Sequence, residues 1–349
     1  MNFVYNLPVN LIFGRGSSDK VGQTAALYGT NALIVTGGSS SKKSGLLDKA
    51  IELLGKAGLK TTVFDKVKQN PWTTTAHEGA AVARENGCDV VVALGGGSIM
   101  DCAKAIAFLS VNEGDVSDYI YGRKSSDRAL PLVLVPTTCG TGSEGNGFAV
   151  LTNPENGDKK SLRSNAIIAK ASIIDSSLMQ TMPKHILSSV AFDALCHSME
   201  AYVSKIAQPL TDYMSVAAMK LIGENLVNVY EGDTSADAWD AITWASTIGG
   251  MVINTAGVVI TEASIDGNET KYATISRLLG GNGSTDCADT IRKLLEKIDL
   301  NVTLSQQGIE DSDIPWMTKN CFKVSVASIA NHPVTFNEDQ VAALYEKAL

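Results

Sequence analysis

The sequence predicts an α/β domain with a doubly wound, Rossmann-like parallel sheet, followed by an all-α domain. Short apolar runs alternate with helix-period segments in the first half, as in the β-α-β-α chains of parallel sheets. Two loops rich in glycine and hydroxyl side chains each follow a buried strand, and from Lys184 the apolar pattern keeps the helical period. A chain of 349 residues has room for two domains. We place them at residues 1–183 and 184–349.

The expected strands of the first domain are unalternating apolar runs, which are typical of strands buried on both faces. They lie at residues 11–13, 32–36, 61–64, 90–94, 132–135 and 172–175. Helices are expected from about residue 17 and at 45–57, 73–86 and from 98 onward. Residues 151–160 predict a hairpin with Asn156-Gly157 at its tip. A linker at 178–183 leads into the second domain.

The most informative turn joins the strand at 90–94 to the next helix and reads Gly95-Gly96-Gly97-Ser98. Glycines let the backbone approach a bulky anion, and a helix start directs free N–H groups and its positive end at that anion. The turn therefore predicts a pyrophosphate site. A tight turn without a ligand is the alternative, because isolated glycine motifs often occur by chance.

A second loop strengthens the nucleotide hypothesis. Residues Pro136 to Glu144 read P-T-T-C-G-T-G-S-E and follow the buried strand at 132–135. Ligands of open α/β sheets bind beyond the carboxyl ends of the strands. Two such loops at one edge are hard to explain as turns alone.

The second domain should consist of helices. We expect them at about 184–205, 211–230, 236–255, 267–280, 285–298, 313–327 and 337–348. Asp193 and His197 are four residues apart in the first of these, so they share one face and could bind a divalent ion together. The alternative is an ion pair on a helix surface, which contributes only a few tenths of a kcal/mol.

Composition narrows the possible partners and location. The chain has 44% hydrophobic and 19% charged residues, which is ordinary for a globular protein, and its net charge of −8 comes without a basic run. We therefore expect no nucleic-acid partner and no membrane partner. No apolar stretch could span a bilayer, and the first six residues do not form a signal peptide. Six scattered cysteines without C-x-x-C suggest reduced thiols, so we expect a cytoplasmic protein.

Three motifs in order resemble the iron-containing, or group III, alcohol dehydrogenase family. They are G-G-G-S-x-x-D-x-A-K (Gly95 to Lys104), P-T-T-x-G-T-G-S-E (Pro136 to Glu144) and D-A-L-x-H-x-x-E (Asp193 to Glu200). The likeness extends over the whole chain with one interruption, and the chain resembles NADPH-dependent butanol dehydrogenase-like members. Enzymes of this family are similar in fold to dehydroquinate synthase and glycerol dehydrogenase.

The resemblance implies a cleft between the two domains that holds cofactor, metal and substrate. Gly96, Gly97 and Ser98 would hold the pyrophosphate. Around the rest of the cofactor, the resemblance assigns Thr137, Thr138 and Thr141 to the nicotinamide and its ribose, Lys159 to the same ribose, and Leu178 to the adenine. Asp193 and His197 would be the first two metal ligands.

The residues after the strand at 32–36 favour NADP(H) over NAD(H). Many NAD-using members carry an aspartate at this place, which binds the ribose hydroxyls and repels a 2′-phosphate. Here the chain has Gly37, Gly38, Ser39 and Ser40, followed by Lys42 and Lys43. Hydroxyl groups and nearby cations suit a phosphate.

The metal site is only half present in the sequence. Family members add two further histidines, but after Gly257-Val258 this chain continues as Val259-Ile260, which resembles a segment well beyond both. Of the remaining histidines, His77 and His185 lie in unsuitable places, and His332 is a poor candidate ligand. Either the sequence as written omits a segment between Val258 and Val259, or the chain truly lacks it. We favour an omission, because deleting a helix would expose apolar surface; a carbon-to-nitrogen distance far beyond about 1.33 Å would reveal it.

The leading interpretation is a metal-dependent, NADP(H)-linked alcohol dehydrogenase or aldehyde reductase acting on a small primary alcohol or aldehyde. Its metal would be Fe²⁺ or Zn²⁺ if the two further histidines exist. We find no strong general base beyond the metal ligands, and we expect a homodimer or a higher homo-oligomer. The alternatives are a glycerol-dehydrogenase-like polyol enzyme, a dehydroquinate-synthase-like lyase, and a non-catalytic nucleotide-binding relative without the metal.

Overall fold

The structure is a computed structural model that describes residues 2–256 and 262–349. The backbone forms two compact units, and the chain passes from one to the other between Met182 and Pro183. The first unit spans Val4–Met182 and contains every strand of the described residues. The second contains Pro183–Leu349 and is built from helices. An α/β unit followed by a helical unit is the predicted fold class, which is confirmed.

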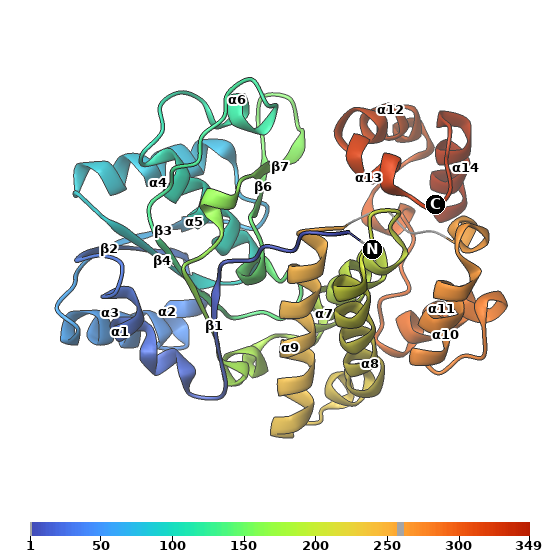
Figure 1. Ribbon diagram of the computed structural model, residues 1–349, viewed down its shortest axis with the longest axis horizontal. Helices are drawn as coiled ribbons and strands as arrows, with labels where there is room; N and C mark the ends of the chain where they lie inside the picture. Colours follow the sequence, from blue (N-terminus) through green and yellow to red (C-terminus); the bar gives the residue numbers. More distant parts are fainter. Residues whose placement is uncertain (1, 257–261) are drawn as a thin grey trace. The chain divides into compact units, whose positions relative to one another are not determined.

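A six-stranded parallel sheet forms the centre of the first unit, with the strand order β1-β8-β5-β4-β2-β3 (Figure 1). The strands are β1 (Asn10–Phe13), β2 (Asn31–Gly37), β3 (Lys60–Val67), β4 (Val90–Gly95), β5 (Leu132–Pro136) and β8 (Ala171–Ile174). Each overlaps an expected strand. The chain moves outward from β2 to β3 and then returns to place β4 on the other side of β2. The carboxyl ends of β2 and β4 therefore flank the switch point at which open α/β sheets bind ligands.

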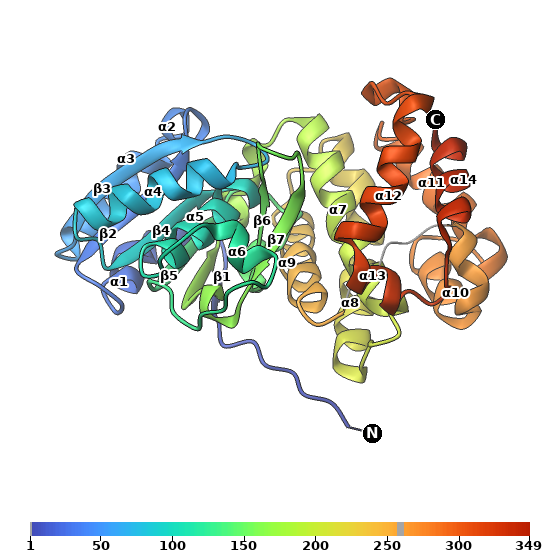
Figure 2. The same ribbon diagram turned by 90° about the horizontal axis from the view of Figure 1, so that it is seen from above.

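Helices cover both faces of this sheet, as Figure 2 shows from above. One face carries α1 (Val21–Ala25) and α3 (Leu46–Lys56), and the other carries α4 (Thr73–Glu85), α5 (Gly97–Leu109) and α6 (Val116–Ile120). Side chains of β2 alternate between the two cores, because successive residues of a strand point to opposite faces. Leu33 and Val35 pack with α4 and α5, whereas Ala32 and Ile34 pack with α1 and α3.

Two smaller elements complete the edge where the strands end. The short helix α2 (Ser40–Lys43) follows β2 directly. The antiparallel hairpin of β6 (Phe148–Thr152) and β7 (Lys159–Arg163) forms a separate two-stranded sheet, which confirms the predicted hairpin. A 3₁₀ helix, Ser176–Thr181, begins after Asp175 and forms most of the segment 178–183 that was expected as a linker.

The second unit is all helical, as predicted. Its helices are α7 (Lys184–Val203), α8 (Pro209–Glu231), α9 (Ala236–Ile253), α10 (Glu269–Leu278), α11 (Cys287–Lys297), α12 (Ile314–Val324), α13 (Val326–Asn331) and α14 (Glu338–Ala348). Local signals set several ends: Ser235 caps α9, Asn337 caps α14, and Gly232 ends α8 in the left-handed conformation. None of the helices in the described residues combines the length and apolar character needed to cross a bilayer.

Candidate functional site

The two predicted nucleotide loops lie against each other at the carboxyl edge of the sheet. The chain leaves β4 through Gly95, whose φ of 157° suits glycine, and enters α5 at Gly97. A Cβ atom on Gly96 would lie 2.7 Å from Thr138 Oγ1, and one on Gly97 would lie 2.5 Å from Thr141 Cγ2. Side chains at these two positions would therefore collide with the loop Pro136 to Glu144, called the threonine loop below. The glycines allow this contact between the two loops. The N–H groups at the start of α5 lack intrahelical partners, as at any helix start, and can bind a ligand.

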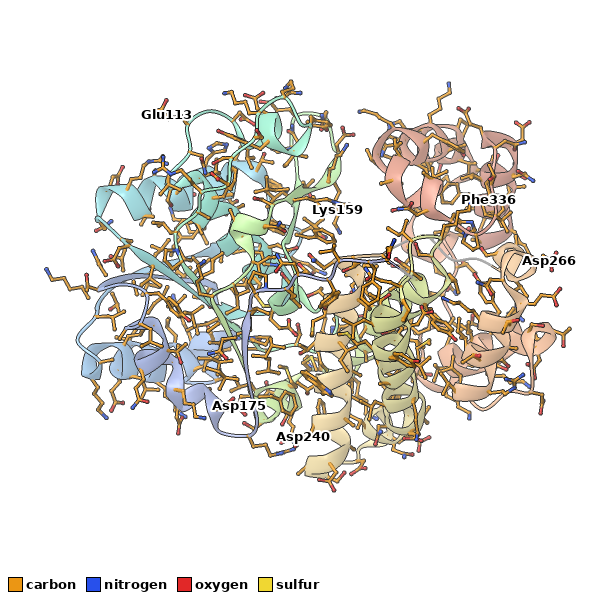
Figure 3. The ribbon with its side chains drawn as sticks, viewed as in Figure 1. Glu113, Lys159, Asp175, Asp240, Asp266 and Phe336 are labelled. Carbon is orange, nitrogen blue, oxygen red and sulfur yellow. The ribbon has the colours of Figure 1, made fainter. Side chains whose placement is uncertain are left out.

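Asn70 forms hydrogen bonds with Ser98 and Lys159, two residues that were predicted to bind the cofactor. Asn70 itself was not predicted. Its backbone N–H donates to Ser98 Oγ at 3.2 Å, and its Oδ1 accepts from Lys159 Nζ at 2.9 Å. Lys159 comes from the hairpin and is labelled in Figure 3. The signal available was Asn70-Pro71 after a strand, since asparagine tolerates the left-handed conformation that it adopts here, with φ of 51°. The contacts that make Asn70 relevant come from residues distant in sequence.

A hydroxyl-rich cavity of about 250 Å³ lies beside the threonine loop. It brings together Ser40, Thr137 and Leu178, which were predicted separately. The complete lining consists of Ser18, Ser40, Ser41, Ser44, Gly45, Leu46, Lys49, Thr137, Ser177, Leu178 and Thr181. Gly37 ends β2, and Ser39 is exposed at the start of α2; neither lines the cavity.

The lysine in the cavity wall is Lys49, whereas the sequence analysis expected Lys42 and Lys43 near the phosphate. Lys42 pairs with Asp65 on the neighbouring strand β3, and the hydrogen bond from Lys42 holds the pKa of that carboxyl below its usual value. Lys43 is exposed. Lys49, which the sequence analysis did not select, lies in the cavity wall and pairs with Asp19.

Asp193 and His197 share one face of α7, as the spacing requires. Asp193 Oδ1 lies 3.7 Å from His197 Nε2, and the two side chains are 43% and 21% exposed. His197 Nδ1 is buried, with no hydrogen-bond partner among the described residues. One turn further along, burial and the Asp193 carboxylate raise the pKa of Glu200 to about 8. A cation bound to this face would reduce the repulsion between the two carboxyl groups.

The described residues do not complete a metal site. They contain no group of three or more histidine, cysteine, aspartate or glutamate side chains arranged to hold an ion. His77 Nε2 accepts from Val116 N, His185 is exposed in the first turn of α7, and His332 Nε2 lies 2.9 Å from Ser264 Oγ. The Val258–Val259 junction lies outside the described residues. Asp193 and His197 fit as two ligands, but this structure gives no basis for a chemical step through a metal.

The fold and the paired loops define a class of protein, a two-domain protein with a Rossmann-like α/β domain and a helical second domain. The chain belongs to the iron-containing alcohol dehydrogenase family. The family model described as iron-containing alcohol dehydrogenase matches residues 8–176. The model described as Fe-containing alcohol dehydrogenase family, C-terminal, matches residues 188–264 and 260–349. The protein is an NAD(P)-dependent alcohol dehydrogenase by this membership.

Relatives align over nearly all of the chain. A 1,3-propanediol dehydrogenase from Klebsiella pneumoniae is 30% identical over 383 residues, which cover 99% of this chain and 98% of the relative. An NADPH-dependent butanol dehydrogenase from Clostridium saccharobutylicum is 27% identical, covering 98% of this chain and 97% of the relative. The crystal structure of an archaeal halo-thermophilic alcohol dehydrogenase from a Red Sea brine pool, bound to NZQ, superposes with a TM-score of 0.94. It is 29% identical and covers 100% of this chain and 99% of that chain.

The comparisons also bear on the interruption after α9. The alignment with the Klebsiella enzyme spans 383 positions against 349 residues in this chain, so at least 383 − 349 = 34 positions have no residue here. The C-terminal family model matches in two pieces that meet at residues 260–264. Part of the relative's chain therefore has no counterpart in this sequence, and the two-piece match shows one discontinuity near residues 260–264.

Proposed function

We propose that this protein transfers hydride between NADP(H) and a small primary alcohol or aldehyde, and that it prefers NADP(H) to NAD(H). The observation that carries the cofactor preference is Gly37 at the end of β2, beside the switch point of the sheet. A carboxylate there would accept hydrogen bonds from the ribose hydroxyls and repel a 2′-phosphate. Glycine does neither.

The charges around Gly37 are compatible with a 2′-phosphate. A Cβ atom on the adjacent Gly38 would lie 3.8 Å from the backbone oxygen of Asp65, so Asp65 is a neighbour of this turn. Its carboxylate is paired with Lys42, and this pair adds no net charge. Hydroxyl groups of Ser39 and Ser40 and the ammonium of Lys43 remain as donors in a phosphate site.

The remaining cofactor residues keep the roles that the resemblance implies. Gly96, Gly97 and Ser98 offer backbone N–H groups to the pyrophosphate at the start of a 13-residue helix. Thr137, Thr138 and Thr141 contact the nicotinamide and its ribose, with Lys159 and Asn70 beside them. Leu178 contacts the adenine from the wall of the cavity, which Thr137 also lines. Bound nicotinamide supplies or accepts the hydride.

We propose Asp193 and His197 as two ligands of Fe²⁺ or Zn²⁺, with the further ligands coming from a segment that this sequence lacks. In that form the protein is a cytoplasmic homodimer or higher homo-oligomer whose two domains are residues 1–183 and 184–349.

Steady-state kinetics of butyraldehyde reduction with NADPH and with NADH tests the proposal. We expect kcat/KM to be at least about tenfold higher with NADPH, the effect of one charge-assisted contact. A clear preference for NADH would reject the cofactor assignment. Metal analysis of the same preparation tests the metal assignment, because a preparation that reduces butyraldehyde without bound metal would reject it.

A further inference from the structure

Lys104 is a fully buried lysine whose ammonium binds only one segment of the chain among the described residues. Its side chain is 0% exposed in the second turn of α5. It donates to Ser143 O at 2.6 Å, Ser143 Oγ at 2.8 Å, Asn146 Oδ1 at 3.0 Å and Phe148 O at 2.8 Å. All four acceptors lie on residues 143–148, from the end of the threonine loop to the first residue of strand β6. An ammonium has three N–H groups, so one of them is shared.

Asp101 binds the same segment from one helical turn earlier. Its Oδ1 accepts from Ser143 Oγ at 2.6 Å, and its Oδ2 accepts from Val150 N at 3.0 Å. The Ser143 hydroxyl group therefore accepts a hydrogen bond from Lys104 and donates one to Asp101. The carboxylate and the ammonium together fix residues 143–150 against α5.

The same helix touches the loop again at its first turn, where Gly97 lies against Thr141. Only Gly142 separates Thr141 from Ser143, so the contacts of Lys104 and Asp101 fix the position of the threonine loop relative to the glycine turn. Burial lowers the pKa of Lys104 to about 8, against the opposing effect of Asp101 and Glu144. Apolar residues of similar volume often stabilise a core as well as a buried ion pair does. A role in fixing one loop arrangement explains the polar network better than stability alone.

We propose that Lys104 and Asp101 are positioning residues that hold the threonine loop in register with the glycine turn, so that the nicotinamide half of the cofactor is bound in one orientation. This inference rests on the proposed function, in which the two loops bind the cofactor. It assigns Lys104 and Asp101 no contact with the cofactor. Their loss should weaken contacts to the nicotinamide half and spare those to the adenosine half, which is bound across the cavity formed by α2, α3 and residues 176–181.

Two ligands distinguish binding of the nicotinamide half of the cofactor from binding of the adenosine half. NADPH carries both, whereas 2′,5′-ADP carries the adenosine with its 2′-phosphate and lacks the nicotinamide. Dissociation constants for both are measured by equilibrium titration with wild type and with the variants Lys104→Met, Asp101→Asn and Ser143→Ala. Lys104→Met removes the ammonium at similar length, and Ser143→Ala is the mild variant that removes only the shared hydroxyl. Lys56→Met, an exposed lysine of α3, is the control. Circular dichroism confirms that each variant is folded.

We expect Lys104→Met and Asp101→Asn to weaken NADPH binding by about tenfold or more, the effect of losing hydrogen bonds to a charged group, with 2′,5′-ADP changed less than about twofold. Ser143→Ala should shift NADPH binding in the same direction by a smaller factor, and Lys56→Met should match wild type. Emission from bound NADPH should also change in the variants, because the ring is held differently.

Equal weakening of both ligands, or no weakening of either in Lys104→Met and Ser143→Ala, would overturn the positioning role while leaving the proposed function intact. If Lys104→Met does not fold, the same comparison in Ser143→Ala decides. Wild type that binds neither NADPH nor 2′,5′-ADP would reject the proposed function and this inference together.

Discussion

Gly97 and Thr141 are in contact across the two nucleotide loops, so close that a Cβ atom on Gly97 would lie 2.5 Å from Thr141 Cγ2. Gly97→Ala must displace the threonine loop, which contains the proposed nicotinamide contacts. We expect the dissociation constant for NADPH to rise by about tenfold or more, in line with the usual cost of overpacking. Equilibrium titration measures it.

The matched control for Gly97→Ala is Gly55→Ala in α3, where a Cβ atom would meet nothing within 4 Å. That substitution should leave NADPH binding unchanged and stabilise the protein by up to about 1 kcal/mol, because alanine favours helix. Wild-type affinity in Gly97→Ala would show that the contact is not part of the cofactor site.

Gly37 should control the choice between the two cofactors. A Cβ atom there would lie 3.3 Å from Ile99 Cδ1, close enough to require a small adjustment. Gly37→Asp places a carboxylate near the ribose, and we expect the ratio of kcat/KM for NADPH to that for NADH to fall by about tenfold or more. Gly37→Ala carries the same steric cost without the charge and should lower both values alike. An unchanged ratio in Gly37→Asp would place the 2′-phosphate elsewhere.

Asp175 should make the wall of the cavity sensitive to acid. Its side chain, labelled in Figure 3, accepts from Ser18 Oγ at 2.7 Å and from Ser177 Oγ at 2.6 Å, and both serines line the cavity. Burial raises its pKa, but these hydrogen bonds outweigh burial, so the pKa lies below the usual value. The carboxylate therefore contributes stability above the unfolded-state pKa of about 3.9, and this is lost as pH falls through the lower folded-state pKa.

Asp175→Asn should lower the free energy of unfolding by about 2 kcal/mol at neutral pH, since it replaces hydrogen bonds to a charged group. The difference from wild type should shrink when unfolding is measured below about pH 4, because the carboxyl binds a proton in the unfolded state before it does so in the folded state. A difference that stays constant between pH 7 and pH 3 would contradict the assignment of charge to Asp175.

Asp193 should be needed for the metal and dispensable for the cofactor. Asp193→Ala removes one of the two ligands on α7, and we expect bound iron or zinc to fall by about tenfold or more while NADPH affinity stays within about twofold. Glu224→Ala, which removes an exposed carboxylate paired with Lys220 on α8, is the control. Elemental analysis after dialysis against the metal gives the occupancy. A variant that keeps wild-type metal content would show that α7 does not bind the ion.

The fold was accessible from sequence because its signals are local. Uninterrupted apolar runs predicted the buried strands, and the helical period predicted α7 to α12 and α14 with small errors at their ends. The five-residue helix α6 and the six-residue helix α13 were missed because segments so short carry little periodicity. The glycine and threonine loops were found because their residue types are unusual at the end of a strand.

Site residues could not be predicted from the sequence where their role depends on residues that are distant in the chain. Lys104 stands in a recognisable motif, but a lysine in a helix is usually solvated, and only the packing of α5 shows it to be fully buried. Lys42 was expected to bind phosphate, and its pairing with Asp65 depends on the neighbouring strand. Asn70 is relevant through Ser98 and Lys159, which lie 28 and 89 residues away in the chain.

The central claim is that the paired loops and Gly37 form a nicotinamide nucleotide site that prefers the 2′-phosphate. Equilibrium titration of the wild-type protein with NADPH and NADH tests it most directly, because the readout does not depend on metal or turnover. We predict that NADPH binds at least about tenfold more tightly than NADH, as one charge-assisted contact would provide. Equal or tighter binding of NADH would contradict the claim.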